Sequence, residues 1–445
     1  MNIKSIFNKI IFPEKNQLKR IALEEERLPI EELKRIQWIN LKKLLNHAYK
    51  NVPFYRMKFE KAGITPDDIK KPADMKKIPV TTKEELKENF PDSVIARNLP
   101  KNRFFLNRTS GSSGAPFEFY IGGAQNNEER KALFRIQAAM GIEFGGTIIR
   151  IRNHNVKGHG LKIQLQKLFG NTKHLSTKGL KLSDLPNYIK FIRKHKPSVL
   201  ESFPHHILAL AAYMKEKCIT LNVRNIHIVG GNASKSEKKL LSELFNAQIF
   251  NDYGASECMY IAYQCEQRNQ YHLEITRYFI EILNKGKDAK ENEMGEIVLT
   301  NLFNYAMPFI RYRIKDLAIV GGTCNCRRTF PVIRGIEGRV QQVIFLPNGR
   351  LLDQNLIRNQ FSRRASKVKA FQCIYRKENV FEIKVVPAGG YTNETENELI
   401  AGIKKVLHNG IPVKIVKVDS IPLYGAEQKE MSILTEAPPD LTKVE

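Results

Sequence analysis

The segment Asn251-Asp-Tyr-Gly-Ala-Ser-Glu257 directly follows the apolar run Ala247-Gln-Ile-Phe250. The apolar run predicts a buried strand, and the glycine predicts a turn at the carboxyl end of that strand. Ligands of α/β sheets bind at such strand ends. Tyr253 could stack on a nucleotide base, and the carboxylate of Glu257 could hold a magnesium ion beside a triphosphate. A plain strand-to-helix turn is the alternative interpretation.

The sequence around this segment alternates strand-like runs with helical segments. Ile148-Ile-Arg-Ile151 and Ile226-His-Ile-Val229 are examples of short runs rich in β-branched residues. Such alternation is typical of an α/β fold. Because 445 residues exceed one ordinary core, we expect three parts: a helical N-terminal segment (1–100), a core (101–342) and a small α+β domain (343–445).

A loop of glycines and small hydroxyl residues, Thr109-Ser-Gly-Ser-Ser-Gly-Ala-Pro116, precedes the strand-like run Phe117-Glu-Phe-Tyr120. The backbone N–H groups of such a loop can approach a polyphosphate, and its hydroxyls can donate to phosphate oxygens. The loop is not a Walker loop, because no lysine follows its last glycine in the required place. Taken alone, it is also compatible with a flexible turn.

A third stretch, Pro308-Phe-Ile-Arg-Tyr-Arg-Ile-Lys-Asp316, follows the strand-like run Gly295-Glu-Ile-Val-Leu-Thr-Asn301. A carboxylate such as Asp316 is suited to accept hydrogen bonds from both hydroxyls of a ribose. Arg311 could hold an α-phosphate. The fourth stretch is Ile336-Glu-Gly-Arg-Val340, where a glycine beside an arginine is suited to a hinge.

These four stretches, taken in their order along the chain, resemble the adenylate-forming ligase superfamily, and within it the phenylacetate–CoA ligase and CapK-like group. The segments Asn51-Val-Pro-Phe-Tyr-Arg56 and Pro79-Val-Thr-Thr-Lys-Glu-Glu-Leu86 support the narrower resemblance, as does the arginine-rich run Arg311-Tyr-Arg-Ile-Lys-Asp316. The resemblance covers nearly the whole chain. It implies a large N-terminal domain that holds ATP and an acid, and a small mobile C-terminal domain that rotates between two half-reactions.

The resemblance also implies the site residues. Catalytic roles fall to Lys429, Glu257 and Arg311. The residues that would contact ATP are Thr109, Ser110, Gly111, Ser112, Ser113 and Gly114 in the phosphate loop, Gly231, Asn232 and Ala233 beside adenine, the run Asp252, Tyr253, Gly254, Ala255, Ser256 and Glu257, and Asp316 and Arg339. The implied cofactors and substrates are ATP, Mg²⁺ and a small carboxylic acid.

The implied reaction joins AMP to the acid, releases pyrophosphate and passes the acyl group to an acceptor. CoA is one candidate acceptor. A second candidate, from the CapK-like use, is an amine or hydroxyl on a sugar precursor of a surface polysaccharide, such as a capsular one. The alternative function is a catalytically impaired nucleotide-binding protein of polysaccharide biosynthesis.

The chain departs from the resembled pattern at three positions. Ala115 stands where many members have a lysine, and Gln342 stands where an aspartate commonly serves as the hinge. Near the C-terminus, Gln428 stands in place of the glycine that commonly precedes the catalytic lysine. These departures are what keep the catalytically impaired alternative open.

Four further residues predict a metal site. Cys265 and His272 are seven residues apart, and Cys324-Asn-Cys326 follows about fifty residues later. Three thiolates and one imidazole suit a tetrahedral structural zinc ion. Some phenylacetate–CoA ligase-like proteins have matching positions. Buried unpaired cysteines and an exposed histidine are the alternative.

The chain is strongly basic, with 72 Lys and Arg residues against 46 Asp and Glu residues, and a formal net charge of +26. Such an excess favours an anionic partner, although a generally basic proteome would give the same composition. Asp184 is the only acidic residue between 157 and 196, so this stretch is either a basic face for an anionic partner or a solvated helical surface. No nucleic-acid-binding module is recognisable, and we expect no nucleic-acid partner.

The sequence predicts a cytoplasmic protein, because no secretory signal is visible and the six cysteines are scattered. Residues 3–12 are compatible with a basic amphipathic helix that contacts a membrane peripherally, but an ordinary terminal helix is the favoured interpretation. The oligomeric state stays open.

Overall fold

The structure is a computed structural model that describes residues 13–108, 117–142, 146–152, 172–177 and 184–339. Beyond residue 343 it describes shorter stretches: 344–345, 351–352, 357, 360–361, 364, 367–376, 378–407, 410–419, 421 and 433–435.

Helices form the first part of the described chain. They are α2 (Pro13–Glu25), α3 (Ile30–Asn51), α4 (Pro53–Lys61) and α5 (Lys83–Glu88), with short 3₁₀ turns η1 (Pro66–Asp68), η2 (Pro72–Lys77) and η3 (Lys101–Arg103). Helix α3 ends at Asn51, because Pro53 has no amide hydrogen to continue it and begins α4. Helix α5 begins with a capping box. The Glu85 N–H donates to Thr82 Oγ1 at 3.2 Å, and the Thr82 N–H donates to Glu85 Oε2 at 2.7 Å.

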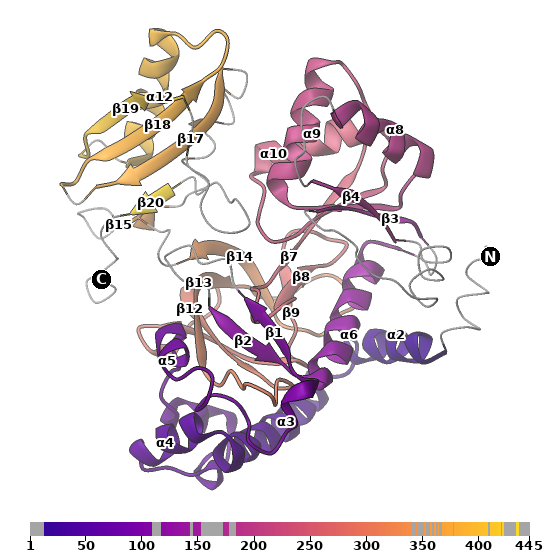
Figure 1. Cartoon of the computed structure of the whole chain (residues 1–445), viewed down its shortest axis with the longest axis vertical. Coiled ribbons are helices and arrows are strands. Elements are labelled where there is room, and N and C mark those ends of the chain that lie inside the picture. Colours follow the sequence, from indigo (N-terminus) through magenta and orange to yellow (C-terminus); the bar gives the residue numbers. More distant parts are fainter. Residues whose placement is uncertain are drawn as a thin grey trace.

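A twelve-stranded sheet forms the centre of the molecule (Figure 1), in the order β11-β10-β12-β13-β14-β9-β8-β7-β6-β5-β3-β4. We call its parallel strands the parallel half: β3 (Ile148–Arg152), β4 (Thr172–Ser176), β5 (Val199–Ser202), β6 (Asn225–Ile228) and β7 (Gln248–Tyr253). Alternate apolar residues of these strands form a core with α8 (Leu185–His195), α9 (Pro204–Glu216) and α10 (Lys235–Phe245). The three helices cover one face of the parallel half (Figure 1).

The other strands form the antiparallel half, which begins where β8 pairs antiparallel with β7. Its members are β8 (Ala262–Gln264), β9 (Tyr271–Leu273), β10 (Tyr278–Asn284), β11 (Lys287–Asp288), β12 (Met294–Asn301), β13 (Tyr312–Val320) and β14 (Val332–Arg339). This half shares the largest core with α3, α4 and the hairpin of β1 (Phe105–Arg108) and β2 (Glu118–Ile121). Helix α6 (Gly123–Ala139) lies beside this core and contacts α2.

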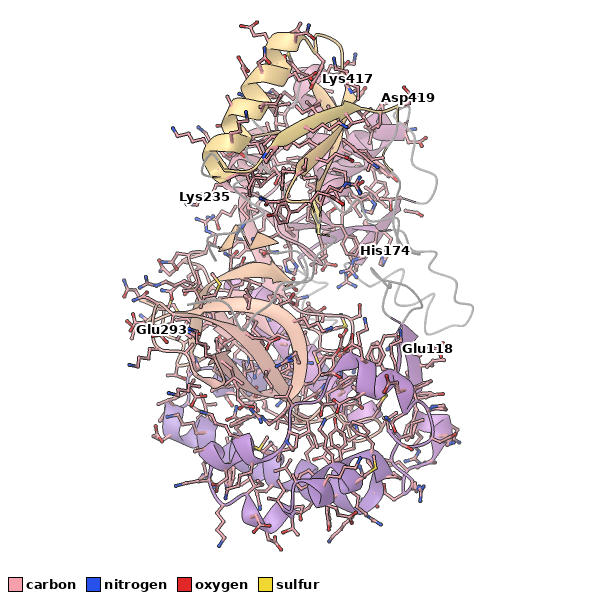
Figure 2. The ribbon with its side chains drawn as sticks, turned by 90° about the vertical axis from the view of Figure 1, so that its left-hand side faces the viewer. Glu118, His174, Lys235, Glu293, Lys417 and Asp419 are labelled. Atoms are coloured by element: carbon pink, nitrogen blue, oxygen red, sulfur yellow. The ribbon has the colours of Figure 1, made fainter. Side chains whose placement is uncertain are left out.

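The C-terminal part has a sheet and a core of its own. Its sheet has the order β19-β18-β17-β20, built from β17 (Val368–Tyr375), β18 (Phe381–Pro387), β19 (Val413–Lys417) and β20 (Ile433–Thr435). Helix α12 (Asn393–Leu407) packs on this sheet through Leu399 and Ile403. A small hairpin of β15 (Ile344–Phe345) and β16 (Leu351–Leu352) precedes it. In Figure 2, Lys417 and Asp419 lie at the end of the molecule opposite the N-terminal helices.

These elements agree with the α/β pattern that the sequence predicts. The C-terminal region contains both strands and a helix, as expected for an α+β unit. The division into functional domains at about residue 342, and any rotation of the small domain, stay predictions.

Candidate active site

The carboxyl end of β7 turns sharply at Gly254. A Cβ on this residue would lie 2.6 Å from the Tyr260 nitrogen, so only glycine fits without a shift of the backbone. The turn is closed by a hydrogen bond from the Ala255 N–H to the Cys258 carbonyl at 2.9 Å. The Ile261 N–H returns to the Tyr253 carbonyl at 2.7 Å. The segment therefore folds back on itself instead of leading straight into a helix, and it presents Gly254 and Ser256 to solvent.

Two carboxylate–tyrosine pairs join β7 and the turn that follows it to β13. The Tyr253 hydroxyl donates to Asp316 Oδ2 at 2.7 Å, and the Tyr312 hydroxyl donates to Glu257 Oε1 at 2.8 Å. All four side chains are buried. The structure thus brings together the predicted stretches 251–257 and 308–316, which lie about sixty residues apart in the sequence. Tyr312 was not among the predicted site residues, although it lies within the arginine-rich run.

The turn after β6 borders the same corner. Gly230 has φ +67°, and a Cβ there would lie 2.3 Å from the ring of Phe203. The side-chain amide of Asn251 donates to the carbonyls of Ile228 at 2.8 Å and Gly231 at 2.9 Å, so it fixes this turn to β7. Gly231 and the following Asn232 are exposed, as a nucleotide contact requires, whereas Ala233 is buried. The role of Asn251 in fixing this turn was not predicted from the sequence. The sequence feature that could have indicated it is a side-chain amide directly after an apolar strand-like run.

The side chain of Arg311, which the sequence assigns to an α-phosphate, forms hydrogen bonds with other groups of the protein. Its Nε and Nη2 atoms each donate to a carboxylate oxygen of Glu281 at 2.9 Å, and Nη1 donates to the Ile78 carbonyl at 2.5 Å. The side chain is 5% exposed. Its contact with an α-phosphate stays a prediction. In the structure the guanidinium instead ties β10 and the segment before α5 to the start of β13.

A charged row crosses the parallel half at the carboxyl ends of its strands, on the face away from α8, α9 and α10. Arg150 lies opposite Glu201, and Glu201 lies opposite His227, in strand register. Asp252 completes the row from β7, with its Oδ2 3.5 Å from His227 Nε2. Arg150, Glu201 and His227 were not among the predicted site residues, although the runs that contain Arg150 and His227 were predicted as strands.

The electrostatics of this row are unusual for the middle of a sheet. His227 is 1% exposed and Glu201 3%. Although burial opposes the charge, the two carboxylates raise the pKa of His227 to about 9. Contacts with His227 and the two arginines lower the pKa of Glu201 to about 2, again against the effect of burial. His227 is therefore a buried imidazolium at neutral pH.

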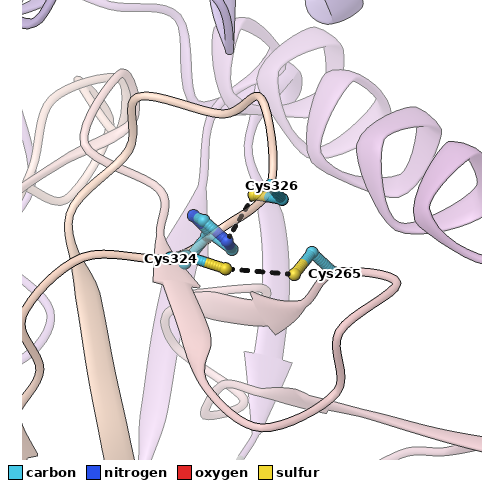
Figure 3. A group of neighbouring side chains, drawn as sticks. Cys265, Cys324 and Cys326 are labelled. Atoms are coloured by element: carbon cyan, nitrogen blue, oxygen red, sulfur yellow. Dashed lines mark hydrogen bonds between the residues drawn. The ribbon is translucent and has the colours of Figure 1, made fainter.

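The four predicted metal ligands lie together. The ligand atoms of Cys265, His272, Cys324 and Cys326 are all within 4.8 Å of one another. Cys265 Sγ is 3.6 Å from Cys324 Sγ, and Cys326 Sγ is 3.3 Å from His272 Nε2. Figure 3 shows the three thiols converging from two segments of the chain. Tetrahedral zinc, with Zn–S about 2.3 Å and Zn–N about 2.0 Å, would separate such atoms by roughly 3.5–3.8 Å, so the arrangement fits the ion.

The surroundings of these ligands suit a metal. His272 Nδ1 lies 3.1 Å from the Phe330 carbonyl oxygen, which favours the tautomer with its proton on Nδ1 and leaves Nε2 to face Cys326. Burial raises the pKa of the Cys265 thiol to about 12 and lowers that of His272 to about 4. Burial thus keeps the groups neutral, and a bound cation would take the thiols as thiolates.

Several predicted residues lie outside the described part of the chain. These are the phosphate-loop residues Thr109, Ser110, Gly111, Ser112, Ser113 and Gly114, the candidate lysine Lys429, residues 3–12, most of the stretch 157–183, and the departures Ala115, Gln342 and Gln428. For Arg339 only the backbone is described, and it pairs with Asp316 across β13 and β14.

A hollow of about 580 Å³ lies elsewhere, at the amino ends of β6 and β7. Arg224, Gln248 and Arg268 contribute to its walls. Parallel sheets bind ligands at the carboxyl ends of their strands, so we place the candidate site at the Tyr253–Asp316 corner. Among the described residues, no helix has the length and apolar character needed to cross a membrane.

Comparisons with known proteins show relatives in sequence and in fold. No protein-family model matches the chain. The chain is 28% identical to phenylacetate-coenzyme A ligase of Escherichia coli (strain K12) over 332 residues, which cover 70% of this chain and 72% of that protein. It is 25% identical to phenylacetate-coenzyme A ligase of Thermus thermophilus over 335 residues, covering 73% and 74%. The chain is similar in sequence to phenylacetate–CoA ligases.

Solved structures show the fold. The chain matches 2-hydroxyisobutyryl-CoA ligase, in its postadenylation state with 2-HIB-AMP, with a TM-score of 0.74 and 20% identity over 93% of this chain and 91% of that one. It matches O-succinylbenzoate coenzyme A synthetase of Bacillus subtilis, in complex with AMP, with a TM-score of 0.52 and 16% identity over 74% and 67%. The predicted α/β adenylate-forming ligase fold is thereby confirmed.

Proposed function

We propose that this chain is an AMP-forming ligase that activates a carboxylic acid as an acyl-adenylate and passes the acyl group to CoA. One observation carries the proposal: the pairs Tyr253–Asp316 and Glu257–Tyr312 converge at the carboxyl end of β7. Similarity to phenylacetate–CoA ligases over about 70% of the chain, together with the ligase fold, supports it.

In the proposed complex the nucleotide lies at this corner. The carboxylate of Asp316 accepts hydrogen bonds from the ribose hydroxyls, and the Tyr253 hydroxyl holds that carboxylate in place. The exposed turn at Gly231 and Asn232 borders the adenine. Glu257, oriented by Tyr312, offers carboxylate oxygens of the kind that bind Mg²⁺. That ion would neutralise charge on the triphosphate.

The proposed chemistry has two half-reactions. A carboxylate oxygen of the acid attacks the α-phosphorus of ATP, the bond from that phosphorus to the bridging oxygen breaks, and pyrophosphate departs with the electron pair. The thiolate of CoA then attacks the acyl carbon, and AMP departs. In both steps the protein mainly supplies position and compensating charge.

Lys429 is the proposed lysine of the first half-reaction, supplied by a small domain that begins near residue 343 and rotates between steps. A point charge that acts mainly in the transition state affects rate more than binding. Lys429→Ala should slow adenylation by roughly 2.7–4 kcal/mol of barrier, by analogy with a lost oxyanion donor, with little change in ATP affinity. Transfer from a chemically made acyl-adenylate should survive. Adenylation at the wild-type rate would exclude Lys429 from this role.

Cys265, His272, Cys324 and Cys326 are proposed to hold a structural zinc ion. The ligand spacing and the Phe330 contact support this proposal. Four protein ligands leave no open position for a reactant, so the ion would stabilise the fold. The zinc ion would connect the chain after β8 to the loop between β13 and β14. Strands β13 and β14 flank the nucleotide corner.

The test is exchange of labelled pyrophosphate into ATP with a panel of acids, followed by addition of CoA. We expect acid-dependent exchange and then thioester formation. Acid-dependent exchange followed by transfer to an amino sugar, and not to CoA, would support the narrower role in surface polysaccharide biosynthesis. ATP binding without exchange for any acid would support the catalytically impaired alternative.

A further inference from the structure

We propose that Arg150, Arg152 and His227 form a cationic subsite beside the nucleotide corner that binds a second anionic group on the acid substrate. The inference rests on the proposed acid-activating function and deepens it by naming the substrate class. The substrate would be a carboxylic acid that carries an additional carboxylate or phosphate-like group, in contrast to an acid with an apolar tail.

Position is the first argument. Arg152 is the last residue of β3, Glu201 lies one residue before the end of β5, and His227 lies one residue before the end of β6. The carboxyl ends of parallel strands meet at one edge of a sheet, where ligands bind. The subsite thus lies on the same edge as Tyr253, and its neighbour Asp252 directly precedes that tyrosine.

Charge is the second argument. Three cationic groups, Arg150, Arg152 and His227, face two carboxylates, Glu201 and Asp252. The described side chains of the row therefore have one positive charge in excess. An excess charge that is partly removed from water is unfavourable unless a counter-ion compensates it. An anionic group on a ligand would supply that compensation.

The unused hydrogen-bonding capacity is the third argument. Among the described residues, no hydrogen-bond partner exists for Nε of Arg152 or for either ring nitrogen of His227. The His227 nitrogens lie 3.8 Å from Glu201 Oε2 and 3.5 Å from Asp252 Oδ2, too far for a good hydrogen bond. Buried donors are nearly always paired in folded proteins.

Access is the fourth argument. The side chains of Arg150 and Arg152 are 25% and 32% exposed, whereas that of Glu201 is 4% exposed. The two arginines therefore lie on the solvent-accessible side of the row, and the buried carboxylate of Glu201 forms ion pairs with both of them. An entering anion would meet two guanidinium groups, whose donor geometry matches carboxylates and phosphates.

The experiment compares short carboxylic acids by pyrophosphate exchange and by calorimetry with a non-hydrolysable ATP analogue. Valerate and glutarate differ only in the terminal carboxylate, and 3-phosphonopropionate supplies the phosphate-like anion. We expect the wild-type protein to prefer glutarate or 3-phosphonopropionate to valerate. The preferred anion distinguishes a second carboxylate from a phosphate-like group.

Arg150→Gln with Arg152→Gln should weaken the preferred dianion by about 10- to 100-fold and leave valerate unchanged. Lys190→Gln, an exposed cation on α8, is the control for net charge. Because the double variant could lose its fold, Arg152→Lys is measured with it, and melting curves are recorded for both. Arg152→Lys keeps the charge and should retain most of the preference.

The outcomes separate the two proposals. Equal use of valerate and glutarate, unaffected by the arginine variants, would overturn the subsite and leave the proposed ligase activity standing. Arginine-dependent binding of glutarate or 3-phosphonopropionate without exchange for any acid would support the subsite and overturn the activity. Absence of binding for every acid, with ATP bound, would overturn both.

Discussion

Buried charged side chains are paired more closely in one half of the central sheet than in the other. In the antiparallel half, Arg311 and Glu281 form a bidentate pair with both distances at 2.9 Å. In the parallel half, His227 stands 3.5 and 3.8 Å from its carboxylates. The first arrangement is complete without a ligand, and the second is not. The comparison indicates that the Arg311–Glu281 pair is satisfied within the protein, whereas the charged row at the edge of the parallel half retains unused hydrogen-bonding capacity.

Loss of the metal centre in the antiparallel half should give the largest effect on metal content and stability. Cys324→Ser with Cys326→Ser should lower the zinc content from about one ion per chain to none, because two of four ligands are lost, and should lower the melting temperature. Elemental analysis and thermal unfolding measure both. Cys218→Ser with Cys373→Ser removes two thiols elsewhere and serves as the control. Full zinc occupancy in the Cys324/Cys326 variant would place the metal at another site.

Breaking the Arg311–Glu281 pair should follow in size. Arg311→Met leaves Glu281 charged and buried, which should cost about 3–5 kcal/mol of unfolding free energy, measured by urea denaturation. Glu281→Leu added to that variant should restore much of the loss. If ATP binding and exchange recover together with stability, Arg311 is structural. If stability recovers but exchange does not, Arg311 contacts the nucleotide as the sequence predicts.

The nucleotide corner, where the two halves meet, should show an intermediate effect. Asp316→Ala removes a charged acceptor worth about 1.5–3 kcal/mol, so ATP binding should weaken by roughly ten- to a hundredfold in calorimetry. Tyr253→Phe keeps the ring and removes only the hydroxyl that holds Asp316, and should weaken binding less. ATP affinity that stays unchanged in Asp316→Ala would refute the ribose assignment.

The charged row should give the smallest effect, and a pH-dependent one. The folded-state pKa of His227, about 9, is raised above the ordinary value of 6.5. Its contribution to stability is therefore fully present below about pH 6.5 and is lost as the pH rises through 9. The loss between pH 7 and 9 should be on the order of 1–2 kcal/mol by linkage.

Urea denaturation of the wild-type protein and of His227→Gln at both pH values isolates this contribution from other titrating groups, including the thiols. Identical pH dependence in the two proteins would show that His227 does not bind its proton in the folded state. The row would then hold two cations and two carboxylates, and the argument from excess charge would fail.

Local sequence determined a large part of this protein. Pro53 ends one helix and begins the next, and the Thr82–Glu85 capping box begins a third. Gly254 makes the turn after β7, and the spacing of Cys265, His272, Cys324 and Cys326 anticipated a cluster that the structure contains. Each of these follows from residues whose backbone preference or chemistry can be read within a short window, or from ligand types that suit one kind of ion.

Only the tertiary structure decided which charged groups meet. Glu201 and His227 are adjacent because β5 and β6 are neighbours in a particular register, and Arg311 faces Glu281 because β10, β12 and β13 are consecutive in the sheet. Local propensity fixes which residues form strands but not the order of the strands. The strand order depends on how the whole chain buries its apolar surface. It therefore decides which residues far apart in the sequence become neighbours, and no local pattern specifies those pairs.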